Sequence, residues 1–263
     1  MKYFIVFLCA LLPAGSAMAQ EASGDSARAL SSAPAEAPSG KLLLRRIDRN
    51  LLVDQAISRA TMIIHGRTGR RAITSRSWIR GQDSVYVEYL SPARERGKKM
   101  LRLGDKLWTY TPEPNDRIIT ISGHLLRQSL MGSDLSYEDM MENHSLDEKY
   151  QATVVGLEQI DDRPCWVVQL LAKVEDVAYH SRRIWVDAER WLPLQGERYA
   201  KSGKLLKTTR IVEVFYAGDR WYPKKMIFKD ALSRGEGTEY IIESIDFDVQ
   251  IPDHKLSKAA LRE

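Results

Sequence analysis

Residues 85–110 read VYVEYLSPARERGKKMLRLGDKLWTY and hold three short β-rich runs separated by turn residues. The first run stops at Ser91-Pro92, and the second and third are joined by Gly104-Asp105. A Gly-Asp pair between two β-rich runs is typical of a tight hairpin. The stretch therefore predicts adjacent antiparallel strands.

The same pattern continues on both sides of this stretch. Two runs precede it, over 59–65 and 72–80, and each is followed by a glycine. Seven runs follow a helical interruption, over 150–157, 165–172, 181–187, 192–199, 205–215, 221–229 and 238–245. Short runs that repeat about every 8–12 residues between turn residues indicate an antiparallel meander. A sheet of about eleven such strands must curl, so the sequence predicts a mainly β fold.

Segments with helical spacing interrupt and flank the β-rich runs. Apolar residues in 41–50 form one stripe, 123–131 and 137–142 lie in the middle of the chain, and 254–261 is a further short helix. A barrel closed around solid packing needs no cover, whereas an open sheet must have its apolar concave face covered by helices. Because the helical segments are separate, we predict a half-open antiparallel β-barrel of about eleven strands with a helical lid.

The first residues have the layout of a secretory signal. Lys2 precedes an apolar run over 3–12, and Ala17-Met18-Ala19 places small residues where a signal peptidase reads. The apolar run is too short for a membrane anchor. We therefore expect residues 1–19 to be a signal peptide that is cleaved after Ala19, and the mature protein to be in the periplasm.

Composition separates a leader from a folded domain. Residues 20–40 are rich in Ala, Ser, Pro, Glu and Gly, and bury too little apolar surface to offset their ordering entropy, so we predict a disordered leader. One domain is expected over 41–263, without an internal repeat. Cys165 is the one cysteine left after processing, so the mature protein has no intramolecular disulfide.

Charge and motif searches argue against several function classes. The full chain has 39 Lys and Arg against 35 Asp and Glu, a balance too mild to indicate a nucleic-acid partner. The sequence has no Gly-x-Ser-x-Gly, no phosphate-cradling glycine-rich loop and no His-Glu-x-x-His, and its five histidines stand singly. We expect no enzymatic activity, no metal and no cofactor; a hydrolase whose Ser, His and Asp meet only in space stays as an alternative.

Four motifs carry a family resemblance: LWTYTP at 107–112, SLMGSDLSYEDM at 129–140, RPCWVV at 163–168 and YAKSGKLLK at 199–207. In this order and spacing the chain resembles the outer-membrane lipoprotein-sorting proteins, the LolA-like family of the bacterial periplasm. The resemblance covers residues 44–261, and the MGSDLSYED stretch is its most specific part.

The resemblance implies a half-barrel with a helical lid, a LolA/LolB-like fold that holds acyl chains of lipoproteins or other lipids in an apolar cavity. It also implies a monomer that accepts cargo from an inner-membrane exporter, such as one of the RND type, and delivers it to an outer-membrane acceptor. A sixteen-carbon chain gains on the order of 12 kcal/mol from burial, so crossing an aqueous compartment requires a dry carrier. A lipid-sensing adaptor of an inner-membrane exporter or signalling protein, with the same fold, is the alternative.

Strand alternation together with the resemblance predicts which apolar residues touch lipid. The predicted lipid-binding residues are Trp78, Val85, Val87, Tyr89, Leu101, Leu103, Trp108, Tyr110, Leu130 and Met140. Each of them also fits an ordinary core position, because aromatic and aliphatic residues routinely fill barrels, and periodicity does not choose between the two roles.

The specific motif supplies a second group of candidates. These are Gly132, Ser133, Asp134, Tyr137, Glu138 and Asp139. Gly132 permits a left-handed turn, and Ser136 with Asp139 has the spacing of a capping box in which Asp replaces the usual Glu or Gln. A role at the cavity mouth, in the lid or in partner docking is the alternative, and the two roles are compatible. The basic hairpin at Arg67, Arg70 and Arg71 is a further candidate contact for anionic head groups or a partner.

Overall fold

The computed structural model describes residues 37–66, 69–141, 146–175 and 177–263. The predicted signal peptide, residues 1–19, and most of the predicted leader lie outside the described residues. Among the described helices, none is long and apolar enough to cross a membrane.

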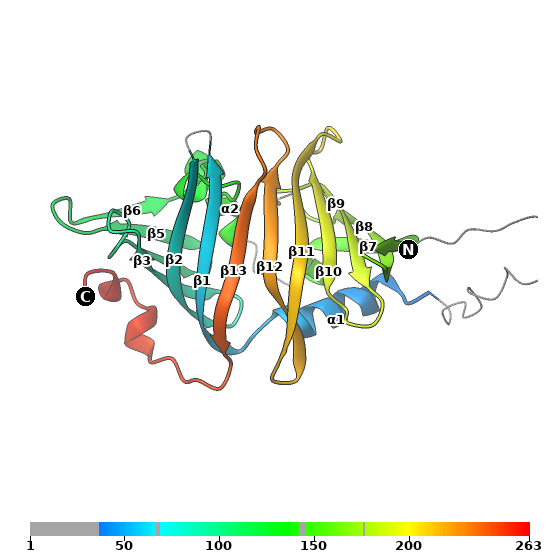
Figure 1. Cartoon of the computed structure of the whole chain (residues 1–263), viewed down its shortest axis with the longest axis horizontal. Coiled ribbons are helices and arrows are strands. Elements are labelled where there is room, and N and C mark those ends of the chain that lie inside the picture. Colours follow the sequence, from blue (N-terminus) through cyan, green and yellow to red (C-terminus); the bar gives the residue numbers. More distant parts are fainter. Residues whose placement is uncertain (1–36, 67–68, 142–145, 176) are drawn as a thin grey trace, which may run out of the picture. The chain divides into compact units, whose positions relative to one another are not determined.

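One open, antiparallel sheet of thirteen strands dominates the described part of the chain (Figure 1). The strands are β1 Gln55–Gly66, β2 Gly69–Arg80, β3 Ser84–Ser91, β4 Lys99–Leu103, β5 Lys106–Thr111, β6 Arg117–Ile121, β7 Tyr150–Ile160, β8 Arg163–Ala172, β9 Ser181–Asp187, β10 Pro193–Tyr199, β11 Leu205–Ala217, β12 Arg220–Asp230 and β13 Thr238–Asp246. Their order is β6-β5-β4-β3-β2-β1-β13-β12-β11-β10-β9-β8-β7. The mainly β, open fold is as predicted, with thirteen strands in place of about eleven.

Sheet order explains why the structure has a lid. Strands β6 and β7 follow each other in sequence but form the two opposite edges of the sheet, so the chain between them must cross from one edge to the other. That connection holds η1 Gly123–Arg127, η2 Leu130–Gly132, α2 Tyr137–Met141 and α3 Leu146–Lys149. Its apolar side chains pack against one face of β1–β5, which we call the inner face. The predicted helical lid is present, although 123–131 forms two short 3-10 turns with no single helix across them.

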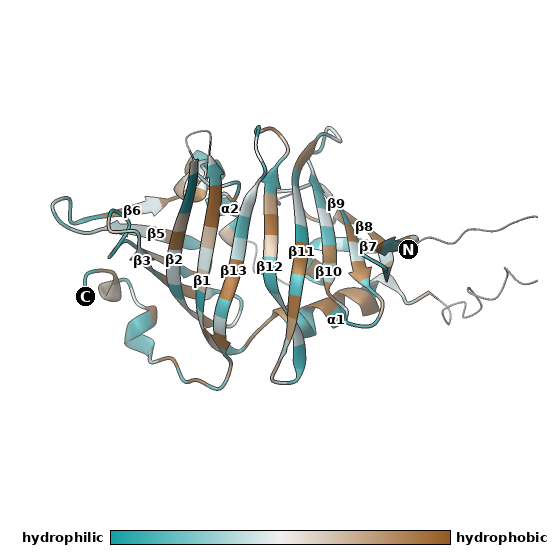
Figure 2. Cartoon of the chain, in the orientation of Figure 1, coloured by the Kyte–Doolittle hydropathy of each residue, from teal (hydrophilic) through white to brown (hydrophobic). Residues whose placement is uncertain are grey.

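Helix α1, Gly40–Leu51, covers another part of the inner face (Figure 1). The hydroxyl of Ser39 caps it by accepting a hydrogen bond from Leu42 N at 3.3 Å. Leu43, Leu44 and Ile47 are buried and pack against inner-face residues of β7, β8 and β9, as the apolar stripe predicted. Figure 2 shows this hydrophobic side of α1 and the alternating hydropathy along the central strands.

The opposite, outer face of β2–β5 is also covered. Residues Trp78, Tyr86, Leu101 and Trp108 lie directly opposite one another on these four strands and form one apolar row. The C-terminal segment packs on this row through η3 Asp253–Leu256 and η4 Ala259–Leu261. The single helix predicted over 254–261 is wrong, because Ser257 between the two turns has extended backbone angles (φ −129°, ψ 156°).

Candidate functional site

A cavity of about 390 Å³ lies between α1 and the inner face of β9–β13, and we call it the inner cavity. Its volume falls in the range of roughly 300–1,000 Å³ that is typical of ligand pockets. Apolar side chains from α1, α3 and the sheet dominate the lining: Ile47, Leu51, Leu146, Ile184, Ile211, Met226, Phe228, Tyr240 and Ile242. Burial raises the pKa of Tyr240 to about 12, so its phenol is neutral in this apolar setting.

Gly196 helps to create the space. It lies on β10 between Ile184 of β9 and Thr209 of β11, and all three line the inner cavity. A Cβ at this position would meet Ile184 Cγ2 at 3.7 Å as its nearest neighbour, which is ordinary van der Waals contact. The missing side chain therefore leaves room between two neighbouring strands.

Three basic residues form a row at one end of the inner cavity. Arg182 of β9 lies opposite Arg198 of β10, which lies opposite Lys207 of β11. We call these residues the cationic row. Arg182 and Arg198 line the inner cavity, whereas Lys207 lines an adjacent pocket of about 510 Å³ whose walls carry many polar residues. The row therefore marks the boundary between an apolar space and a polar one.

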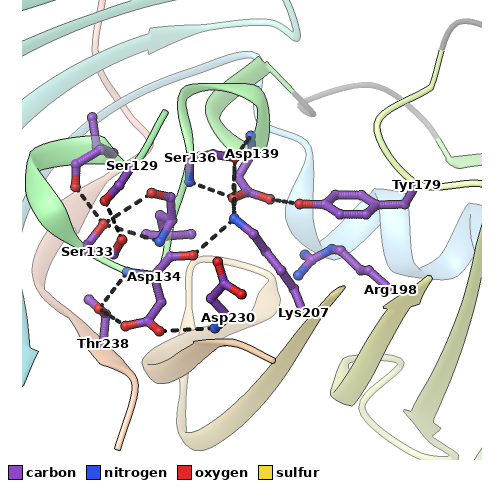
Figure 3. Close-up of polar contacts among 12 residues, drawn as sticks. Ser129, Ser133, Asp134, Ser136, Asp139, Tyr179, Arg198, Lys207, Asp230 and Thr238 are labelled. Atoms are coloured by element: carbon purple, nitrogen blue, oxygen red, sulfur yellow. Dashed lines mark hydrogen bonds and ion pairs between the residues drawn. The ribbon is translucent and has the colours of Figure 1, made fainter. Parts of the chain in front are cut away.

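Aromatic rings and a carboxylate surround the cationic row. The Arg182 guanidinium lies 4.6 Å from the Tyr150 ring centroid and 5.4 Å from that of Tyr179. Asp139, on α2, contacts Lys207 Nζ and accepts a hydrogen bond from the Tyr179 hydroxyl at 2.7 Å (Figure 3). Burial alone would raise the pKa of Asp139, but Lys207 and Arg198 outweigh it and the pKa is lowered. The lid thus places an ionised carboxylate against the row.

Asp134 connects the lid to the β12–β13 hairpin by hydrogen bonds. Its carboxylate accepts hydrogen bonds from Thr238 Oγ1 at 2.7 Å and Asp230 N at 3.0 Å (Figure 3). It also accepts one from Ser233 Oγ at 3.1 Å. Lys207 Nζ also donates to the Asp134 carbonyl oxygen at 3.0 Å. The lid segment is therefore fastened to both β11 and the β12–β13 hairpin.

The remaining motif residues shape the lid itself. Gly132 has a φ of +74°, the left-handed conformation that the sequence predicted. The predicted capping box is present, because Ser136 N donates to Asp139 Oδ2 at 2.7 Å and Asp139 N donates to Ser136 Oγ at 3.3 Å. The Ser133 hydroxyl donates to the Leu130 carbonyl at 2.6 Å. Tyr137 packs against the inner-face core, and Glu138 lines the polar pocket.

The basic hairpin of Arg67, Arg70 and Arg71 was predicted to contact anionic head groups or a partner. One of these residues instead contacts the lid of the protein itself. Arg71 donates a hydrogen bond to the carbonyl of Met131 in the lid, so it fixes the lid loop from β2. Arg70 is exposed, and Arg67 lies outside the described residues.

The structure divides the ten predicted lipid-binding residues between the two faces of the sheet. Five belong to the inner-face core: Val85, Val87, Tyr89, Leu130 and Met140. The other five pack on the outer face beneath the C-terminal segment: Trp78, Leu101, Leu103, Trp108 and Tyr110. All ten are described, and none of them lines the inner cavity. Alternation fixes the two faces within each strand, but the face that turns inward depends on strand register, which the sequence does not provide.

The inner-face group lies next to the inner cavity. Val87, Tyr89, Leu130 and Met140 surround a space of only about 30 Å³, which shares Tyr240 with the inner cavity. The lid side chains fill this half of the inner face, whereas the half under α1 stays open. The cationic row was not predicted from the sequence, because its three members come from three different strands. Lys207 is the last residue of the quoted motif 199–207, and Arg198 directly precedes that motif.

Among the described residues, no group of three or more His, Cys, Asp or Glu side chains is arranged to hold a metal ion. The site consists of an apolar cavity, a cationic row in which Arg182 is buried and Arg198 and Lys207 are half-buried, and a fastened lid. Such a combination defines a lidded half-barrel that can enclose an apolar ligand.

The comparisons with known proteins place this architecture in a family. A family model of uncharacterized, DUF1329-like proteins matches residues 81–263, so the chain belongs to that family. A comparison with curated proteins gives no match.

Solved structures share the fold at low sequence identity. A DUF1329 family protein from Desulfovibrio piger is 23% identical, with a TM-score of 0.76, over 85% of this chain and 98% of that one. A putative outer membrane lipoprotein-sorting protein domain from Vibrio parahaemolyticus is 21% identical, with a TM-score of 0.74, over 86% and 98%. A LolA superfamily protein from Nitrosomonas europaea is 23% identical, with a TM-score of 0.71, over 85% and 100%. These similarities establish a LolA-like fold.

Proposed function

We propose that this protein is a periplasmic carrier that holds the acyl chains of lipoproteins or other lipids in the inner cavity and transfers them towards the outer membrane. One observation carries the proposal: an apolar cavity of about 390 Å³ lies between α1 and the open sheet. Half-buried apolar residues such as Phe228 and Met226 line it. Covering them with acyl chain removes apolar surface from water at about 25 cal/mol per Å².

The fold supports binding as the primary activity. An open sheet with a fastened lid encloses a ligand and releases it when the lid moves, and neither step requires a reacting group. We assign no catalytic residue. Residues 1–19 have the layout of a signal peptide, which supports the periplasmic assignment. The source and acceptor of the cargo are proposed to be an inner-membrane exporter and an outer-membrane protein.

The experiment compares two substitutions on the same strand. Phe228 lines the inner cavity, whereas its neighbour Ile227 points to the outer face by alternation. Binding of a pyrene-labelled long-chain alcohol is measured by fluorescence for the wild-type protein, Phe228→Glu and Ile227→Glu. We expect Phe228→Glu to weaken binding roughly tenfold or more, because it buries a charge in the acyl path, and Ile227→Glu to bind as the wild type does. Absence of binding by the wild-type protein, or equal loss in both variants, contradicts the proposal.

A further inference from the structure

The cationic row destabilises the sheet, and the binding of acyl chains alone does not require such a row. Its three members lie directly opposite one another on adjacent strands, where like charges destabilise a sheet. Arg182 is 7% exposed, and the Lys207 side chain is 12% exposed, so water screens these charges poorly. Apolar side chains at these positions would avoid this repulsion and would make better contacts with acyl chains. The row therefore points to a ligand that carries negative charge.

The position of the row fits the head of an amphiphile. Arg182 and Arg198 face the inner cavity, and Lys207 faces the polar pocket. An amphiphile whose tail lies in the inner cavity and whose head lies at the boundary with the polar pocket places its head beside the row. Guanidinium groups bind phosphate through paired hydrogen bonds, and a lysine ammonium adds a point charge beside them.

One member of the cationic row already contacts an anionic group of the lid. The Asp139 carboxylate, carried by α2, contacts Lys207 and lines the inner cavity (Figure 3). A phosphate that binds Lys207 therefore takes the position of this carboxylate.

We propose that the cargo is an anionic glycerophospholipid whose phosphate head group binds Arg182, Arg198 and Lys207 while its acyl chains occupy the inner cavity. This assignment rests on the proposed carrier function and specifies its substrate class. Head-group charge, in addition to apolar burial, then selects the cargo.

The test compares two lipids with the same tails. Binding of dioctanoyl phosphatidylglycerol and of uncharged dioctanoylglycerol to the full protein is measured by titration calorimetry at low salt, with inorganic phosphate as a third ligand. We expect phosphatidylglycerol to bind at least roughly tenfold more tightly than dioctanoylglycerol. Inorganic phosphate is expected to bind far more weakly than phosphatidylglycerol, because it lacks the buried tails. Equal affinity for the two lipids overturns the proposal without touching the carrier function, whereas failure of both lipids to bind refutes the carrier function as well.

Matched variants locate the preference. Arg198→Gln should weaken phosphatidylglycerol binding roughly tenfold more than it weakens dioctanoylglycerol binding. Arg210→Gln is the control, because Arg210 lies on β11 beside the row but points outwards and pairs with Asp161. Lys207→Gln provides a second variant if Arg198→Gln does not fold. A preference that survives both row substitutions, or that Arg210→Gln removes equally, overturns the assignment.

Discussion

Gly196 shows how one missing side chain shapes the candidate site. Its backbone does not require a positive φ, and a new Cβ would have no neighbour closer than 3.7 Å. We predict that Gly196→Leu folds normally but weakens acyl-chain binding roughly tenfold, because the new side chain occupies the inner cavity. Calorimetry of lipid binding checks this. Thr208→Leu, on the outward side of β11, is the control and should bind as the wild type does. Unchanged binding by Gly196→Leu would mean that lipid lies elsewhere.

The second prediction for a single residue concerns the contribution of Asp134 to stability. Its carboxylate holds three donors, and one of them, Thr238, is fully buried. Removing the carboxylate leaves buried donors unsatisfied, so Asp134→Ala should lower the free energy of unfolding by about 1–3 kcal/mol. Urea denaturation measures the difference. Ser233→Ala removes the exposed donor alone and should change stability by less than about 0.5 kcal/mol. Equal effects of the two substitutions would show that Asp134 is not a buried tether.

Single-residue features were predictable where they depend on local chemistry. The left-handed Gly132 and the capping box of Ser136 and Asp139 follow from short-range spacing and are present. The cationic row depends on the register of three strands, because a shift by one residue would turn Arg198 to the outer face. Such long-range register is not written in the spacing of any one segment.

At the scale of elements, the lid is fastened by an ion pair that depends on pH. The pKa of Asp139 is lowered in the folded protein, chiefly because Lys207 and Arg198 outweigh the effect of burial. The stability that this carboxylate contributes is therefore present above its unfolded pKa of about 3.9 and is lost as the pH falls through the lower folded value. We predict that Lys207→Met destabilises the protein by roughly 2 kcal/mol at neutral pH and by progressively less below about pH 4.

Urea denaturation at a series of pH values measures this difference. Lys204→Met, in the exposed turn before β11, is the control and should have almost no effect at any pH. A loss of stability in Lys207→Met that does not change with pH would contradict the assignment of Asp139 as the partner of Lys207.

The sequence predicted most elements and the lid, but not the cover on the outer face of the sheet. Helix α1 and the Gly104-Asp105 hairpin agree with prediction, because an apolar stripe and a turn pair are local signals. Strand β6 was not predicted, since its five residues follow directly on a turn. The C-terminal turns were predicted as one helix, and their docking on Trp78 and Trp108 was not foreseen, because packing between distant segments leaves no periodic trace.

At the scale of the whole domain, sheet order and lid position are linked. Because β6 and β7 form opposite edges, the segment that joins them covers the inner face, while α1 leaves a cavity beside it. The predicted half-open barrel with a lid anticipated this architecture. The inner cavity lies under α1, and the aromatic residues of β3 and β5 that were predicted to bind lipid do not line it.

The central claim is that the inner cavity carries lipid, and one measurement tests it most directly. The protein is purified from its native cells without detergent and analysed by native mass spectrometry and lipid extraction, beside Phe228→Glu prepared in the same way. We predict a bound acyl-bearing molecule in the wild-type protein that is lost in Phe228→Glu. A wild-type protein that is empty, and that stays empty when phospholipids and lipoproteins are offered, would contradict it.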